Sequence, residues 1–402
     1  MTGLVEANRI TQEYSRQSRR TKSQTPNAED SVFLQGCFRL YLAFMHPAQP
    51  MMLRRFSMVV RIACLTLVAG SACVARNASA NVDEQTGFFA ATVENDSFAN
   101  MFGDHQDRHY TAGLKIMLFG GDDFATNLTT RLNRLENWGI VPEAAQLGWV
   151  MLGQNIYTPE DIMDSMPIHE DRPYAGWLYT GAVYQRRGAL SDNLFVMENF
   201  EFNLGVVGPY SLAEESQKTV HRWWFPDDIP KGWGHQLHNE PGLVLKYERL
   251  WRYSPTKETA RHFDVIPYIG GDLGNVFTFA QAGTAVRAGF NLPDDFGMQI
   301  IDSPASVNGG LTRKAPFWSA YAFGGMTGRA VGHDVTMDGN SFRGGPSVEK
   351  RNLVGDLTWG GALRLFRHLE IAYTHTERTI EFRGQHGDDK FGSITVKGLF
   401  CF

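Results

Sequence analysis

The sequence predicts an all-β protein, a transmembrane antiparallel β-barrel of about 12 strands. Segments of about ten or more residues with β-type composition recur between turn-rich pieces, and their number is even, as in bacterial outer-membrane barrels. After residue 80, no apolar run approaches the roughly 18 residues that a transmembrane helix requires. The chain also ends in an alternating segment that closes on an aromatic residue.

The predicted strands follow one another along residues 87–402. Strands of this length are unusual for a soluble β-sandwich, which would also bury the aromatic residues that gather here toward strand ends. The predicted ranges are 87–95, 109–119, 144–156, 176–187, 194–207, 241–253, 261–273, 275–290, 315–328, 351–366, 367–382 and 391–402.

The last predicted strand, GSITVKGLFCF, shows the alternation most clearly. Its apolar residues share one face, namely Ile394, Val396, Phe400 and Phe402. The other face carries Ser393, Thr395 and Lys397. One face therefore suits hydrocarbon and the other suits a polar lumen.

The amino-terminal part is predicted to be a targeting segment. Residues 51–80 have a basic start, an apolar run and a small-residue site at Ala78-Ser79-Ala80, as in a cleaved secretory signal. Residues 1–50 are polar without periodicity and are interpreted as a mistranslated upstream leader or an unusually long n-region of the signal peptide. The barrel is therefore expected to comprise residues 81–402, exported to the outer membrane of a Gram-negative cell.

Charge and cysteine content narrow the functional classes. Residues 1–80 hold ten of the 38 Lys and Arg and four of the 43 Asp and Glu, which leaves 28 basic and 39 acidic residues, a net charge of −11. That acidic balance argues against nucleic acid as a partner. After residue 80 only Cys401 remains, so no internal disulfide is available.

Two interstrand segments are too long for plain turns. Residues 120–143 are expected to include a short amphipathic helix with Leu128, Leu132 and Leu135 on one face. Residues 208–240 begin with a Gly-Pro turn and continue as a helix-like run rich in tryptophan. Long barrel loops normally face the cell exterior, and such loops are often functional.

Polar residues gather where the first predicted strand ends and the second begins. Asn95 and Asp96 leave the barrel wall there, and Thr111 enters the next strand. Their amide and carboxylate oxygens are the hard ligands that Ca²⁺ prefers. The alternative interpretation is an ordinary Asn-Asp-Ser turn.

His221 is the candidate general base of the long 208–240 segment. Gln217 precedes it by one helical turn, and Asp227 and Asp228 follow it. Imidazole titrates near neutrality, and a carboxylate can hold its tautomer. The alternative is a surface histidine in a solvated loop.

Two further motifs are given structural interpretations. In HEDRPYAGWLY, residues 169–179, Asp171 and Arg172 are expected to form a lumen-side salt bridge where a strand begins. His105 and His109 are four residues apart but flank a turn, so zinc binding by this pair is not expected.

Five short motifs in order resemble the outer-membrane lipid A 3′-O-deacylase family. They are ENDSF, DRHYTAGL, NIYTP, DRPYAGWLYTG and HRWW, and the resemblance runs from about residue 88 to Phe402. It implies a twelve-stranded barrel that uses Ca²⁺ and a histidine-activated water to hydrolyse the 3′-linked acyloxyacyl ester of lipid A. Lipid A, or lipopolysaccharide, and the outer-membrane bilayer would then be its partners. A monomer is the expected state.

The resemblance also implies roles for individual residues. His221 matches the catalytic histidine, and Asn95, Asp96 and Thr111 match catalytic positions of the family. Asn95, Asp96, Gln217 and Asp227 are the implied metal-side residues, Asp227 standing where the family's deacylase has Glu.

One departure leaves other functions open. A family lysine has no clear counterpart between Thr158 and Asp171, where the segment is acidic. Two alternatives therefore stand beside the deacylase. They are a non-catalytic pore or binding barrel on the same scaffold, and a phospholipase-type esterase.

Overall fold

The computed structural model shows a closed barrel of twelve antiparallel strands, which confirms the predicted fold class. The structure describes residues 86–99, 108–120, 141–256, 258–297, 316–367 and 369–401. The strands are β1 (Thr86–Asn95), β2 (His109–Gly120), β3 (Val141–Thr158), β4 (Ala175–Ser191), β5 (Leu194–Val207), β6 (Glu240–Tyr253), β7 (Phe263–Gly274), β8 (Phe277–Phe290), β9 (Trp318–Asp334), β10 (Leu353–Leu365), β11 (Leu369–Arg378) and β12 (Asp389–Cys401).

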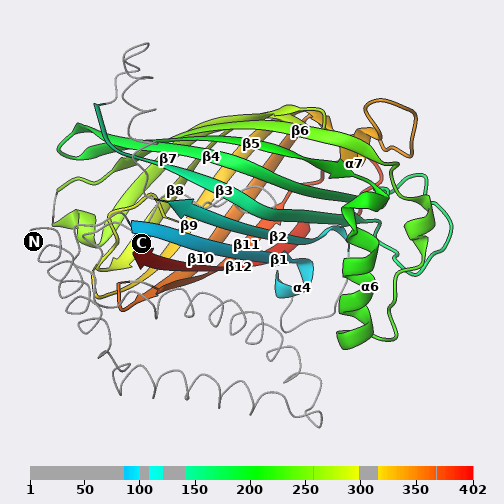
Figure 1. Cartoon of the computed structure of the whole chain (residues 1–402), viewed down its shortest axis with the longest axis horizontal. Helices are drawn as coiled ribbons and strands as arrows, with labels where there is room; N and C mark the ends of the chain where they lie inside the picture. The colour runs from blue at the N-terminus through cyan, green and yellow to red at the C-terminus, as the bar shows by residue number, and fades with distance from the viewer. Residues whose placement is uncertain are drawn as a thin grey trace, which may run out of the picture. The chain divides into compact units, whose positions relative to one another are not determined.

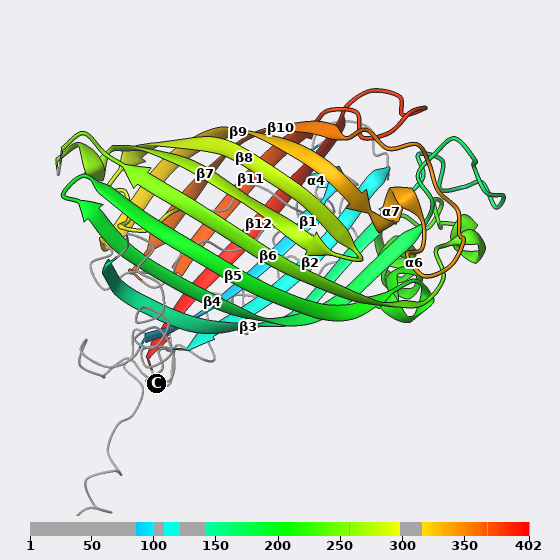
Figure 2. The same ribbon diagram turned by 90° about the horizontal axis from the view of Figure 1, so that it is seen from above.

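Each strand pairs with its sequence neighbours, and β1 pairs with β12 to close the cylinder (Figures 1 and 2). The closing register joins Thr86 to Cys401 at one end and Asn95 to Gly392 at the other. Closure leaves no strand edge, so every strand finds backbone partners on both sides, as hydrocarbon surroundings demand.

The two ends of the barrel differ. β1 begins and β12 finishes at one end, where β4 and β5 are joined by two residues. The opposite end, here called the loop end, carries the 32 residues between β5 and β6. Short turns face the periplasm and long loops face outward in such barrels, which places the loop end at the cell exterior.

Most of the short helices lie at the loop end (Figures 1 and 2). They are α4 (Asp96–Ala99), η1 (Pro209–Ser211), α6 (Ala213–Trp224), η2 (Gly232–His235) and α7 (Val335–Asp338), whereas η3 (Thr259–Arg261) joins β6 to β7 at the other end. The helix-like run predicted within 208–240 is therefore confirmed as α6. No described helix is long and apolar enough to cross a bilayer.

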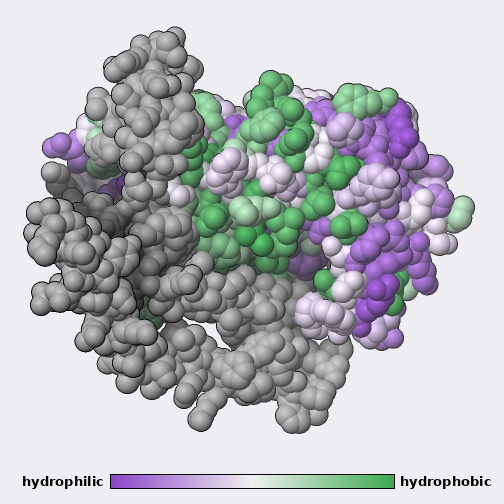
Figure 3. Space-filling view, viewed as in Figure 1, coloured by the Kyte–Doolittle hydropathy of each residue, from purple (hydrophilic) through white to green (hydrophobic). Residues whose placement is uncertain are grey.

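The outer face of the strands is apolar. Large hydrophobic side chains that stay exposed on it include Leu204 on β5, Leu245 on β6 and Leu357 on β10. In Figure 3 apolar residues gather across the middle of the strands, and hydrophilic residues gather at the loop end. A band of this kind suits contact with lipid chains.

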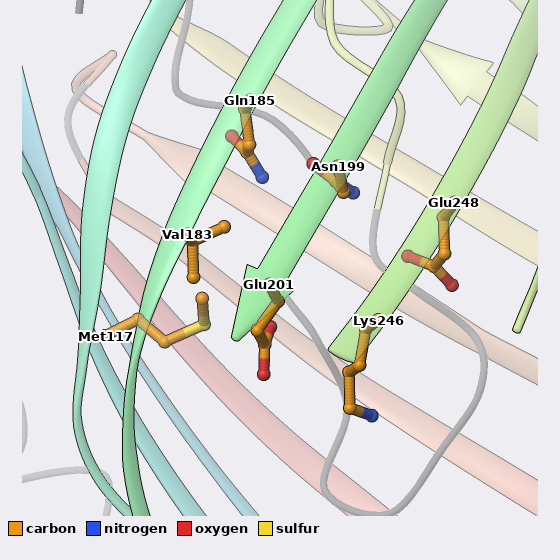
Figure 4. Close-up of a pocket in the computed structure, with 7 residues that line it drawn as sticks. All are labelled: Met117, Val183, Gln185, Asn199, Glu201, Lys246 and Glu248. Carbon is orange, nitrogen blue, oxygen red and sulfur yellow. The ribbon is translucent and has the colours of Figure 1, made fainter. Parts of the chain in front are cut away.

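The lumen is packed with buried charged and polar side chains and with apolar clusters, one of which contains Met117 and Trp177. Fully buried pairs cross it, such as Lys115 on β2 with Glu201 on β5. A small hollow remains beside that pair, lined by Met117, Val183, Gln185, Asn199, Glu201, Lys246 and Glu248 (Figure 4). Nearer the periplasmic end, Asp295 from the connection after β8 accepts hydrogen bonds from Arg287 and Arg364, each at 2.6 Å.

The last strand has the two faces that its sequence predicts. Ser393, Thr395 and Lys397 are buried toward the lumen. Ser393 Oγ donates to Glu94 at 2.8 Å, and Thr395 Oγ1 lies 3.0 Å from Thr92 Oγ1. Side-chain bonds thus reinforce the seam between β1 and β12.

Some predicted segments lie outside the described residues. These are the leader at 1–50, the signal peptide at 51–80 and residues 121–140, which hold most of the helix expected in 120–143. Residues 141–143 belong to β3.

Candidate active site

Asn95, Asp96 and Thr111 meet at the loop end of β1 and β2. Asn95 Nδ2 donates a hydrogen bond to the carbonyl oxygen of Thr111 at 2.8 Å. Asp96 is 3 % exposed, and its Oδ2 accepts the backbone N–H of Arg108 at 2.9 Å. Its Oδ1 accepts the N–H of Ser97 at 2.7 Å. Amide and carboxylate oxygens therefore lie side by side at one corner of the rim.

A β-bulge places Thr111 in this corner. The pairing of β2 with β3 skips Thr111 between Tyr110 and Ala112. Such a bulge re-aims a side chain and interrupts the ladder. The Thr111 hydroxyl lies 2.7 Å from the hydroxyl of Thr158, the last residue of β3, which ties the bulge to the next strand.

His221 and Gln217 lie one turn apart on the buried face of α6. His221 is 5 % exposed, so the interpretation as a surface histidine in a solvated loop is wrong. Its Nδ1 lies 2.6 Å from the carbonyl oxygen of Asp228, where the chain turns back after the helix. A carbonyl can only accept, so Nδ1 carries the proton and the lone pair stands on Nε2. Gln217 Oε1 accepts the indole N–H of Trp233 at 2.8 Å.

Helix α6 packs on β3 and β4. It meets β4 at Gly176, which faces the outside of the barrel wall because the next residue, Trp177, belongs to the buried cluster inside. Gly176 at the start of β4 permits the contact, because a Cβ there would lie 2.4 Å from the Cβ of Ala213 and 2.0 Å from Ser211 Oγ. The turn that leaves β5 needs a second glycine, Gly208, whose φ is 93°.

One hydrophobic cluster adjoins both halves of the candidate site. It contains Ile156 of β3, Tyr174, Ala213 of α6 and Trp233, and Ala112 packs against it. Ala112 follows Thr111 directly, and the same Trp233 holds Gln217. The rim corner and the histidine helix are thus anchored to a shared support on the outer side of β2 and β3.

Asp227 differs from the other candidates. It is exposed in the segment after α6, and its predicted role in metal binding stays a prediction. The neighbouring Asp228 contributes instead through its backbone carbonyl, which fixes the imidazole of His221.

A buried ionic cluster braces the rim corner, and sequence reasoning missed it. His109 Nδ1 lies 2.6 Å from Asp389 Oδ1, and its Nε2 lies 3.2 Å from Asp171 Oδ1. His109 is completely buried, with a left-handed φ of 56°. Arg108 donates to the carbonyl oxygens of His386 and Asp388 at 3.0 and 2.6 Å. The cluster links three loops beside Asp96 and Thr111.

Asp171 and Arg172 form ion pairs, but not the predicted pair with each other. Arg172 Nη2 lies 3.0 Å from Glu381 Oε2, and its guanidinium stands over the rings of Tyr157 and Phe382. Asp171 faces His109. The expected partners are wrong because closure of the barrel brings the loop between β11 and β12, which contains Glu381, beside the loop between β3 and β4, which contains Arg172. Burial alone would raise the pKa of Glu381, but Arg172 and Arg378 hold it below its usual range.

The acidic segment between Thr158 and Asp171 has structural roles. Glu160 lies 3.4 Å from both Arg108 and His386, within the ionic cluster. Asp161 and Asp164 accept the backbone N–H groups of Met163 and Met166 at 2.9 and 2.8 Å, as turn residues do.

The brace at Asp171 is expected to loosen in acid. Burial would raise the pKa of Asp171, but the His109 ring and the backbone N–H groups of Glu160 and Arg172 outweigh it and hold the pKa below 3.8. A lowered pKa contributes stability that is present above the unfolded-state value and is lost as the pH falls through the folded-state value. Pepsin cleavage within residues 159–174, followed from roughly pH 5 to pH 2, should therefore rise steeply below about pH 4.

Asp171→Asn should remove most of that pH dependence and give a loop that is cleaved more readily throughout the range. Asp161→Asn is the matched control, since this carboxylate only caps a turn in the same loop. Identical pH profiles for the wild-type protein and Asp171→Asn would show that the brace does not depend on this carboxylate.

The candidate metal ligands at this corner of the rim are oxygen atoms. No group of three or more His, Cys, Asp and Glu among the described residues is arranged to hold a metal ion. His109 is committed to two carboxylates, and His105 lies outside the described residues. Asn95 and Asp96 instead present adjacent amide and carboxylate oxygens. This donor set fits a hard cation such as Ca²⁺.

The family comparison agrees with this fold. The model of the family described as "Outer membrane protein LpxR" matches residues 60–400. The chain belongs to the LpxR family. This match spans every element described above except the final residue of β12, Cys401.

A solved structure of an LpxR protein shows the same fold independently. LpxR from Salmonella typhimurium is 20 % identical, with a TM-score of 0.60, and the match covers 78 % of this chain and 100 % of that one. The β domain of the Bordetella autotransporter BrkA is 9 % identical with a TM-score of 0.36, covering 78 % of this chain and 98 % of its own. No relative emerges from the comparison with curated proteins.

Proposed function

We propose that this LpxR-family protein is an outer-membrane lipid A deacylase that hydrolyses the 3′-linked acyloxyacyl ester with water activated by His221. The observation that carries the proposal is the position of His221. It is buried on a helix that packs against the outside of the barrel wall, with Nδ1 held by the Asp228 carbonyl. A lipid in the outer leaflet would reach such a site from the side.

The chain's own residues supply the proton transfers of the reaction. Nε2 of His221 takes a proton from water as the water oxygen bonds to the ester carbonyl carbon. When the C–O ester bond breaks, the imidazolium returns that proton to the departing sugar oxygen, and the acyloxyacyl chain leaves as a carboxylic acid. The Asp228 carbonyl favours this tautomer throughout, because it accepts from Nδ1.

Asn95 and Asp96 would hold Ca²⁺, with Gln217 and Asp227 as further candidate donors. When bound, the cation would supply Lewis-acid polarisation of the ester carbonyl. Asn95 Nδ2 fixes the amide orientation by donating to the Thr111 carbonyl, so the amide oxygen points away from that contact. The bulge at Thr111 keeps this orientation through its bond to Thr158.

The structure bears differently on the two alternative functions, a pore and a phospholipase-type esterase. A pore needs an open lumen, whereas buried ion pairs such as Lys115 with Glu201 fill the described lumen. A phospholipase-type esterase would use the same histidine and the same lateral approach. The acidic segment does not discriminate between lipid A and phospholipid as the substrate. Its residue Glu160 is already paired with Arg108 and His386.

Mass spectrometry of lipid A tests the proposal. Cells that produce the protein should contain lipid A lacking the 3′-linked acyloxyacyl chain, and cells that produce His221→Gln should not. The purified protein, offered lipid A and phospholipid side by side with Ca²⁺ or with a chelator, separates the two esterase candidates. Unchanged lipid A in the presence of folded protein and Ca²⁺ would overturn the deacylase assignment.

A further inference from the structure

Helix α6 and the turn before it expose large apolar side chains to the surroundings. Trp223 is 72 % exposed, Tyr210 of η1 is 71 % exposed, and Leu212 between the two helices is 52 % exposed. Leu212 also adopts a left-handed backbone with φ of 58°, which glycine or asparagine would tolerate with less strain. The histidine site uses none of these three side chains, so its mechanism does not explain them.

Helix α6 carries three different stripes at helical spacing. The stripe against the barrel wall contains Ala213, Gln217 and His221, all buried. A charged stripe follows on one flank and contains Glu214, Lys218 and Arg222, in which Lys218 pairs with Glu214 at 2.5 Å. The third stripe, on the other flank, contains Ser216, Val220 and Trp223 and carries no charge, and Glu215 lies nearer the charged flank, between Arg222 and Thr219. Residues three and four apart share a helix face, so the charged and uncharged flanks point in different directions.

The placement of α6 gives the two flanks different surroundings. The helix lies across the loop ends of the strands instead of running along them (Figure 1). In Figure 3 the surface of this region is paler toward the apolar band of the strands and strongly hydrophilic toward the loop end. η1 packs against β4 and β5, and β5 carries the exposed Phe202 and Leu204 of the band. Tyr210 and Leu212 therefore continue the lipid-facing surface of β5 outward.

We propose that η1 and α6 form a membrane contact in the outer leaflet. Trp223, Tyr210 and Leu212 lie at the boundary between acyl chains and headgroups, and the charged stripe with Arg222 faces the headgroups and water. Tryptophan and tyrosine prefer this depth, and amphipathic helices lie in the same plane. The contact sets the depth of the helix that carries His221, although it requires no catalytic activity.

Spin labels at two neighbouring residues test the contact without any measurement of catalysis. With the four cysteines of the chain replaced by serine, one variant carries a nitroxide at Trp223→Cys and the other at Arg222→Cys. The protein is placed in vesicles of phosphatidylethanolamine and phosphatidylglycerol. Collisions with oxygen, which concentrates in the membrane, are compared with collisions with a water-soluble nickel chelate.

We expect the oxygen-to-nickel ratio at position 223 to exceed that at position 222 several-fold and to approach that of a lipid-facing reference, Leu204→Cys. Position 222 should resemble Asp192→Cys in the exposed turn between β4 and β5. Equal ratios at 222 and 223, both at the level of the Asp192→Cys reference, would overturn the proposal.

A second measurement avoids the label. Brominated lipids should quench the fluorescence of the wild-type protein more than that of Trp223→Phe, with the bromines at the shallow positions of the acyl chain most effective. Equal fractional quenching of both proteins would contradict the contact. Since Trp223 packs only against Trp224 among the described ring contacts, this replacement should leave the barrel intact.

Discussion

His221→Gln is expected to lower the rate of lipid A deacylation by about 10²- to 10⁴-fold, the usual contribution of a positioned general base. Glutamine is close in size to histidine and can still donate to the Asp228 carbonyl, which now lies 2.6 Å from Nδ1. It cannot take a proton from water near neutral pH. The substitution therefore removes the base while it keeps the contact that holds the loop.

The measurement is the initial rate of ester hydrolysis by the purified protein in detergent, with heat-modifiable gel mobility as the check on folding. His262→Gln is the matched control, because this histidine lies at the opposite end of the barrel and its ring lies 3.0 Å from the Gly289 carbonyl. The residual rate of His221→Gln should not rise with pH, because the variant has no titrating base at this position. Turnover within a few-fold of wild type would refute the assignment of His221, whatever the enzyme class.

The strands could be predicted because a barrel wall has two chemically distinct sides. The segment predicted at 194–207 coincides with β5, and the one at 391–402 differs from β12 by no more than two residues at either end. Alternation of apolar and polar residues predicts which side chains face lipid, and this prediction does not require the partner strand to be known. Local signals likewise predicted α6 and the pairing of Gln217 with His221 on one face of a helix.

The contacts around the site could not be predicted because closure of the cylinder creates them. His109 meets Asp389, a residue 280 positions later, and Arg172 meets Glu381. Each charged residue had several possible partners in the sequence, and only the register of β1 with β12 selects among them. The nearest signal was the density of charge around Asp171, which indicated an ion pair without naming its partner.

Lys115 presents the same problem inside the lumen, and its ion pair leads to the second large effect. Nζ lies 2.7 and 2.9 Å from the two carboxylate oxygens of Glu201, and both side chains are almost fully buried. Asn203 donates to the same carboxylate at 2.7 Å. The pair joins β2 to β5 across two intervening strands, beside the hollow drawn in Figure 4.

Lys115→Met should lower the free energy of unfolding by about 3–5 kcal/mol, because it leaves the Glu201 carboxylate buried without its ammonium partner. Glu201→Gln should be similarly costly, since it leaves Lys115 without its counter-charge. The double variant Lys115→Met/Glu201→Gln leaves no unpaired charge and should be much closer to wild type. Unfolding in urea, followed by tryptophan fluorescence in lipid vesicles, gives the four free energies of this double-mutant cycle.

An exposed ion pair serves as the reference for the loss of stability measured in the double-mutant cycle. Arg383 lies 3.0 Å from Glu349, but the two side chains are 73 % and 65 % exposed. Breaking it should cost no more than about 1 kcal/mol, since solvent screens both charges. If Lys115→Met cost as little as Arg383→Met, water would have to reach the lumen freely enough to solvate Glu201. That result would restore the open channel which the packed lumen argues against, and with it the pore as a function for this barrel.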